Sequence, residues 1–161
     1  MPSGHVTHAE RDGVHVLRYF GRVDYMSAPA IKRFTDDLVG QNLCGLVFDL
    51  SEAENLDSTN LGLLARVADR ARSRCGCRSV IVSTREDINT VLSSMGFDQM
   101  FTIVRDTTRE AEGPEGEELE SAPTAEAELR NVMIEAHRML MGMSEAGRVQ
   151  FQDVVKCLET T

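Results

Sequence analysis

The spacing of apolar residues changes from strand-like to helical several times along the first two thirds of the chain. Runs typical of buried strands lie at 15–20, 45–50, 79–83 and 101–104. Stretches with apolar residues every three or four positions, which predict helices, lie at 27–38, 58–74 and 84–95. Because strands and helices alternate, the pattern predicts an α/β domain with a partly parallel sheet.

The chain opens with a predicted β-hairpin. Residues 6–10 pair with 15–20 across the turn formed by Asp12 and Gly13. The first helix follows, with Ser27 as its predicted N-cap and Pro29 in its first turn, where proline is tolerated. The capping box expected at 84–87 would begin the third helix, and Gly96 would end it.

The second helix begins directly after the strand at 45–50 and displays Ser58 at its N-terminus. Free N–H groups and the positive end of the helix dipole favour an anion there, so a phosphoryl group on Ser58 would be accommodated. Asp57 or Ser58 could instead simply cap the helix, and spacing alone favours this interpretation. The helical pattern places Leu61 in the core and leaves Asn60 exposed.

Charge and cysteine content narrow the classes of function. The chain has 161 residues and a net charge of −9, which argues against a nucleic-acid surface and favours protein partners. No apolar run approaches the roughly 20 residues of a membrane span, and the start lacks a signal-peptide pattern, so we expect a cytoplasmic protein. Cys75 and Cys77 have no matching second pair, and no cluster of histidine, cysteine and carboxylate appears. We therefore expect no metal and no cofactor.

Composition divides the chain into three parts. Residues 1–107 form the predicted domain, 108–121 an acidic flexible linker, and 122–161 an amphipathic helical hairpin whose second helix Ser144 can cap. The linker carries six glutamates between positions 110 and 120. Two amphipathic helices cannot bury both apolar faces alone. We expect the hairpin to pack on the domain, on a second copy in a homodimer, or on a partner.

The order strand-strand-helix-strand-helix-strand-helix-strand resembles the STAS domain family of bacterial anti-sigma factor antagonists. The resemblance implies a mixed β-sheet flanked by helices, followed here by the C-terminal hairpin. The linker and the tail segment 135–142 further resemble the RssC type of pseudomonads. The motifs that carry the family resemblance are 21–24, 49–50, 57–62, 95–98 and 101–103.

The resemblance implies a switch protein rather than an enzyme. Its unmodified form binds an anti-sigma factor or a serine kinase, and phosphorylation of Ser58 breaks that complex; Thr59 is a less favoured phosphoacceptor. The RssC type implies a further partner, the serine/threonine phosphatase domain of a response regulator. The residues assigned to partner binding are Asp24, Asp57, Ser58, Thr59 and Asn60.

Other functions fit the sequence less well. A STAS module that senses GTP or ATP is the main alternative, but the chain lacks a Gly-x-x-x-x-Gly-Lys loop, and the acidic residues beside Ser58 would repel phosphate. A hydrolase is disfavoured because Ser58 lacks the Gly-x-Ser-x-Gly elbow and no histidine has a supporting motif. Asp49, at a strand end, is interpreted as structural, accepting bonds from the loop that follows.

Overall fold

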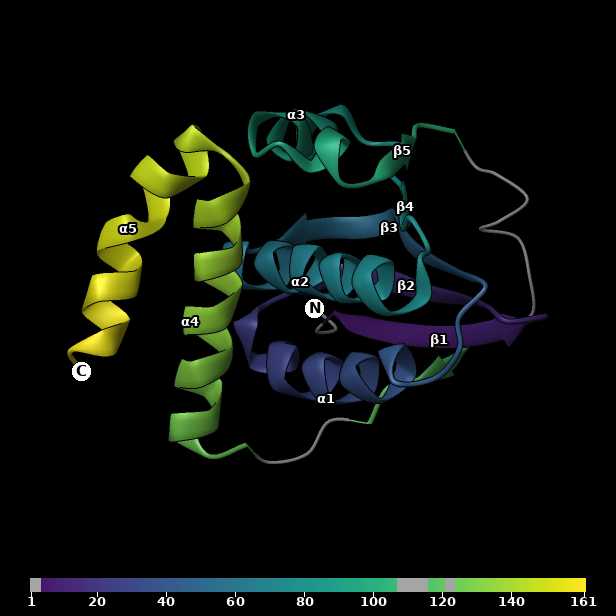
Figure 1. Ribbon diagram of the computed structural model, residues 1–161, viewed down its shortest axis with the longest axis horizontal. Coiled ribbons are helices and arrows are strands. Elements are labelled where there is room, and N and C mark those ends of the chain that lie inside the picture. The colour runs from purple at the N-terminus through teal and green to yellow at the C-terminus, as the bar shows by residue number, and fades with distance from the viewer. Residues whose placement is uncertain (1–3, 107–115, 121–123) are drawn as a thin grey trace.

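In the computed structural model, which describes residues 4–106, 116–120 and 124–161, a mixed sheet forms the centre of the molecule (Figure 1). Within these residues the strand order is β5-β4-β3-β2-β1-β6. β2 to β5 pair in parallel, whereas β1 pairs antiparallel with both β2 and β6. The strands are β1 (His5–Arg11), β2 (Val14–Val23), β3 (Gly45–Leu56), β4 (Val80–Val82), β5 (Thr102–Val104) and β6 (Glu117–Glu118).

Helices flank this sheet, as the alternating pattern predicts, and two more follow at the C-terminal end. α1 and α2 lie side by side against the sheet (Figure 1). The helices are α1 (Ala28–Val39), α2 (Ser58–Cys75), α3 (Glu86–Ser94), α4 (Glu126–Met143) and α5 (Glu145–Glu159), with short 3-10 turns at Tyr25–Ser27 and Phe97–Gln99. The predicted fold, a mixed sheet flanked by helices with a C-terminal helical hairpin, is confirmed.

The core lies between the sheet and α1 and α2. Phe48 of β3 is fully buried and meets Phe101 edge-on, with ring centroids 6.1 Å apart. Phe101 in turn stacks on Phe97 at 5.4 Å. Burial of large aromatic and aliphatic side chains is the main source of stability in such a domain, so the central strands hold the frame in which α2 is placed.

Local backbone geometry agrees with the predicted hairpin and modifies two predicted caps. Asp12 and Gly13 adopt positive φ angles of 53° and 82°, as a tight two-residue hairpin turn requires. Ser27 precedes α1, but its side chain makes no capping hydrogen bond. Likewise, α3 begins after Arg85 without a side-chain cap, so the capping box expected there does not form.

The described part of the acidic segment contains a short strand, which a flexible spacer would not form. Most of the predicted linker, 108–115 and 121, lies outside the described residues. In the described part, Glu117 and Glu118 form β6 on the free edge of β1, and the amide of Leu119 donates to the Val6 carbonyl at 2.9 Å. The unpaired edge of β1 favours pairing with a further strand. The apolar contact of Leu119 with the core further stabilises β6 in this position. Glu117 and Glu118 therefore belong to the sheet, and Leu119 adds one more hydrogen bond to β1.

The hairpin α4–α5 packs on the domain. α4 lies across the ends of α1 and α2, and α5 covers the outer side of α4 (Figure 1). The apolar stripe of α4, formed by Val132, Ala136 and Leu140, is buried. Ser144 caps α5 by accepting from the Gly147 amide at 2.9 Å, as predicted. Of the three predicted positions for the hairpin, the structure shows the one on the protein's own domain.

Two histidines form a hydrogen-bonded pair on β1 and β2. Nε2 of His8 lies 2.8 Å from Nδ1 of His15, and the rings stack. Burial lowers the pKa of both imidazoles, and the neighbouring His15 lowers the pKa of His8 further, although Glu10 and Glu117 act in the opposite direction. The bond needs one donor and one acceptor nitrogen, so protonation of both rings would break it.

We expect stability to fall as the pH drops from about 7.5 to about 5.5, through the ordinary histidine pKa of about 6.5. Histidines with lowered pKa values bind fewer protons in the folded than in the unfolded state, so acid favours unfolding. Urea denaturation at several pH values measures this. The double variant His8→Gln/His15→Gln should show a flatter dependence over the same range, and curves parallel to those of the wild type would contradict the assignment.

Candidate functional site

The site lies where β3 ends and α2 begins. Asp57 is the N-cap of α2, in extended conformation, and its Oδ1 accepts from the Asn60 amide at 3.0 Å. Ser58 is the first residue of the helix and is half-buried. The capping interpretation therefore holds for Asp57 and leaves the Ser58 hydroxyl without a capping role.

Asn60 ties the start of α2 to the end of β2. Its side-chain amide donates to the Val23 carbonyl at 3.2 Å and to Asp57 Oδ1 at 3.0 Å. Asn60 is only 1% exposed and Thr59 only 2%, so the prediction that Asn60 is exposed is wrong: its amide belongs to the internal support of the turn. Leu61 is in the core, as predicted.

The Ser58 hydroxyl is hydrogen-bonded to His137 of α4. Oγ lies 2.8 Å from His137 Nε2, while Nδ1 of the same ring lies 2.6 Å from the Met133 carbonyl. A carbonyl can only accept, so Nδ1 carries a proton, and in the tautomer with that single proton Nε2 accepts from the Ser58 hydroxyl. His137 is 3% exposed and packs edge-on against Phe151 of α5. The hairpin thus covers the predicted phosphorylation site.

Sequence reasoning missed His137, which is 79 positions from Ser58. The available signal was Gly62, one helical turn after Ser58 and therefore on the same side of α2. A Cβ at Gly62 would lie 2.1 Å from the Ala136 carbonyl oxygen. A glycine inside a helix costs stability unless a close neighbour requires it, and here that neighbour is the backbone of α4.

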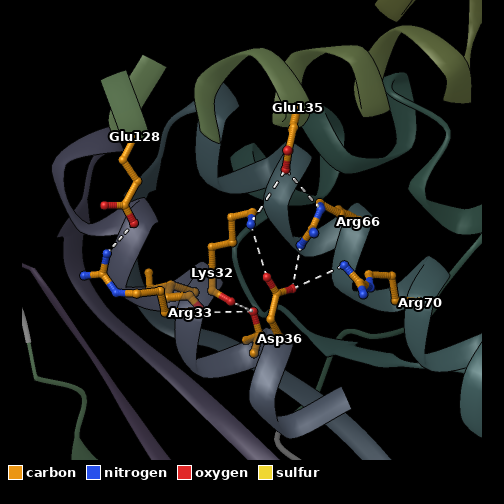
Figure 2. A network of polar contacts seen from close by, with 9 residues as sticks. Lys32, Arg33, Asp36, Arg66, Arg70, Glu128 and Glu135 are labelled. Carbon is orange, nitrogen blue, oxygen red and sulfur yellow. Dashed lines mark hydrogen bonds and ion pairs between the residues drawn. The ribbon is translucent and has the colours of Figure 1, made fainter. Parts of the chain in front are cut away.

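Charged side chains surround this helix contact (Figure 2). Glu135 of α4 lies 3.4 Å from Arg66 of α2 and 3.9 Å from Lys32 of α1. Both cations also pair with Asp36, at 2.8 Å and 3.1 Å. Partial burial opposes ionisation of Asp36, but hydrogen bonds from Arg66 and Lys32 and their positive charges outweigh it and hold the pKa of Asp36 below its usual range.

A second pair, Arg33 of α1 with Glu128, joins α4 to the domain farther along (Figure 2). The side chains of Glu128 and Glu135 are 42% and 47% exposed. Each ion pair this open to water contributes little to the stability of the helix contact. These pairs therefore orient α4 more than they stabilise its packing.

Asp24 lies in the loop that follows β2, next to the Val23 carbonyl that Asn60 binds. Its carboxylate caps the 3-10 turn by accepting from the Met26 amide at 3.0 Å, which is the local capping role the sequence left open. Tyr25 and Met26 are 42% and 64% exposed, unusually open for large apolar side chains. This loop therefore offers an exposed apolar surface close to the start of α2.

Asp49 is structural, as predicted. Its carboxylate accepts from the amide and the hydroxyl of Ser51, at 3.0 Å and 2.6 Å, and pairs with Arg18 at 3.4 Å. Within the described ranges, no three histidine, cysteine or carboxylate side chains are grouped to hold a metal ion. Among the same residues, no helix is both long and apolar enough to cross a membrane.

Comparison with known proteins agrees with this architecture. The family model of the STAS domain matches residues 5–111, which is more than half of the chain. The match ends before α4, so the hairpin that covers Ser58 lies beyond it.

Named relatives are anti-sigma factor antagonists. The anti-sigma-F factor antagonist RsfB of Mycobacterium tuberculosis is 30% identical over 98 residues, 61% of this chain and 79% of RsfB. The solved structure of an anti-sigma factor antagonist from Mycobacterium paratuberculosis is 27% identical and covers 68% of this chain and 91% of its own, with a TM-score of 0.59. Unphosphorylated SpoIIAA, 16% identical, covers 65% of this chain and 91% of its own with a TM-score of 0.56, which shows the shared fold.

We expect Asp57→Ala to lower the free energy of unfolding by about 1–2 kcal/mol, because it removes a helix cap and leaves the Asn60 side chain short of an acceptor. Asp57→Asn keeps a capping oxygen and should cost less. Asp24→Ala is the matched control, since it removes an exposed cap from a single turn. Urea denaturation compares the three. Equal losses for Asp57→Ala and Asp24→Ala would contradict the supporting role of Asp57.

Proposed function

Because the chain belongs to the STAS domain family, we propose that it is an anti-sigma factor antagonist switched by phosphorylation of Ser58. Unmodified, the protein binds an anti-sigma factor and so releases a sigma factor for transcription; phosphorylated, it does not bind. The observation that carries this proposal is the position of Ser58. It opens α2, and its neighbour Asp57 supplies the helix cap, so modification of the Ser58 hydroxyl would not remove the cap.

The charge around Ser58 explains why a phosphate would act as a switch. A phosphoserine adds about −1.5 to −2 charges beside Asp57 and near the exposed loop of Asp24. If the anti-sigma factor docks over the start of α2, these anions are desolvated together and repel one another. Tyr25 and Met26 supply apolar surface for the same contact. Asp24, Asp57 and Ser58 keep their proposed partner-binding roles, whereas the buried Thr59 and Asn60 support the turn from inside.

We assign the chemistry to other proteins. Ser58 and His137 have the spacing of a nucleophile and its base, but the orienting group is a backbone carbonyl and the imidazole is buried where α4 contacts α2 and α5. Ser58 is therefore proposed as the acceptor of phosphate from a serine kinase. Removal by the phosphatase domain of a response regulator follows from the resemblance to the RssC type.

Nucleotide sensing is the weaker alternative. The start of α2 presents N–H groups, but the Asn60 amide is already taken by Asp57. Carboxylates of Asp57 and Asp24 stand on this side of the molecule, and α4 occupies the space next to Ser58. A nucleotide phosphate would meet negative charge and a helix there, so protein binding fits this surface better.

We expect Ser58→Ala to bind the host's anti-sigma factor permanently and Ser58→Asp to bind about tenfold or more weakly, a loss of about 1.4 kcal/mol or more. Only the second variant adds a negative charge at the contact. Titration calorimetry with purified anti-sigma factor measures both affinities.

Ser73→Asp is the matched control. It adds the same charge at an exposed position near the other end of α2, and binding should be unchanged. Equal affinities of Ser58→Ala and Ser58→Asp would overturn the switch, and an equal loss in Ser73→Asp would show a general charge effect rather than a site.

A further inference from the structure

The surface that presents Ser58 already has an occupant. Three positions one helical turn apart on α2 face three successive residues of α4: Ser58 contacts His137, Gly62 contacts Ala136, and Arg66 contacts Glu135. The contact therefore runs along the first half of α2, from its N-terminus inwards. A kinase or an anti-sigma factor that approached Ser58 would meet α4 first.

We propose that α4 is an intramolecular competitor for the Ser58 surface, and that the partner's contact is an α-helix with a small residue opposite Gly62 and a carboxylate opposite Lys32 and Arg66. This inference rests on the proposed function and adds its regulation. In the closed arrangement, α4 fills the surface. In the open arrangement, hairpin 126–159 has left α2 and the partner helix takes its place.

The chemistry of the occupied surface defines the partner helix. Gly62 leaves a gap in the side-chain layer of α2 that admits the backbone of another helix, and a side chain larger than alanine opposite it would hold the helices apart. Lys32 and Arg66 require an acidic residue one position before that small residue, as Glu135 precedes Ala136. Ser58, whose hydroxyl donates to His137, requires an acceptor one position after it.

Phosphorylation and the closed arrangement exclude each other. The 2.8 Å between Ser58 Oγ and His137 Nε2 leaves no space for a phosphorus atom and its three further oxygens. The modified serine also has no hydroxyl proton to donate to the ring. A phosphate on Ser58 therefore displaces α4 as well as the partner helix.

The balance between the two arrangements is set by the contacts that α4 loses when the hairpin leaves α2. Opening exposes the apolar stripe of Val132 and Leu140, which opposes it. The surrounding ion pairs of α4 with the domain are half-exposed and add little. A partner helix that covers the same part of α2 replaces the contacts that α2 loses when α4 leaves. Binding of the partner therefore selects the open state.

The test uses the full chain with Ser58→Cys as a reporter. The rate of iodoacetamide alkylation at position 58 is measured by peptide mass spectrometry, which separates this thiol from the four native cysteines. Adding Gly62→Ala places a methyl group against the Ala136 carbonyl and should raise the rate about tenfold. Gly142→Ala is the matched control, because a Cβ there meets nothing within 4 Å, and it should leave the rate unchanged.

A second pair of variants tests the same contact by charge repulsion instead of steric clash. Glu135→Lys faces Lys32 and Arg66 and should also raise the rate, whereas Glu126→Lys changes a side chain that is 90% exposed on the same helix and should not. Equal alkylation rates in all of these variants would overturn the closed arrangement.

Affinity separates this inference from the proposed function. In the Ser58 background, Glu135→Lys, which changes α4 and leaves the surface of α2 intact, should bind the anti-sigma factor captured by Ser58→Ala more tightly than the wild type, by about fivefold or more. Unchanged or weaker binding despite faster alkylation would overturn the competition while the antagonist function stands. No binding by any variant, Ser58→Ala included, would overturn the proposed function and with it the competition.

Discussion

The hydrogen bonds that Asp57 and Asn60 make with each other and with the end of β2 determine where Ser58 lies. Asp57 caps α2, and the buried amide of Asn60 joins that cap to the Val23 carbonyl, so two neighbouring strands and the helix meet at one fixed point. A polar network centred on a buried amide is costly to break, which makes the turn rigid. The loop of Asp24 and the contact with α4 are both positioned by it.

The turn that supports Ser58 and the helix α4 that covers it are stabilised by different kinds of contact. The support is made of buried hydrogen bonds within the matched STAS region. The cover is a helix that lies beyond that region; it contacts Gly62, the Ser58 hydroxyl and half-exposed charges, and it buries Val132 and Leu140 in the core. A phosphate on Ser58 would disturb the second set while leaving the first in place. The site can thus change its contacts without unfolding the domain.

Much of this fold follows from the spacing of apolar residues, and the family prediction is confirmed. The hairpin turn at Asp12 and Gly13, the α2 boundary and the two C-terminal helices were all predictable, because periodicity and turn chemistry are local properties. The burial of Asn60 was not, because its partner, the Val23 carbonyl, is 37 positions away. The Ser58–His137 contact depends in the same way on tertiary packing that no local pattern records. The RssC-type assignment and the kinase and phosphatase partners remain predictions.

Hydrogen exchange of the full chain, with phosphoserine incorporated at position 58 and without it, tests the central claim most directly. If Ser58 switches the surface, the amides of 126–143 should lose protection in the phosphorylated chain, while those of β2 and β3 keep theirs. Unchanged protection of α4 in the phosphorylated chain would contradict the account, because Ser58 could then carry its phosphate without disturbing the surface that it is proposed to control.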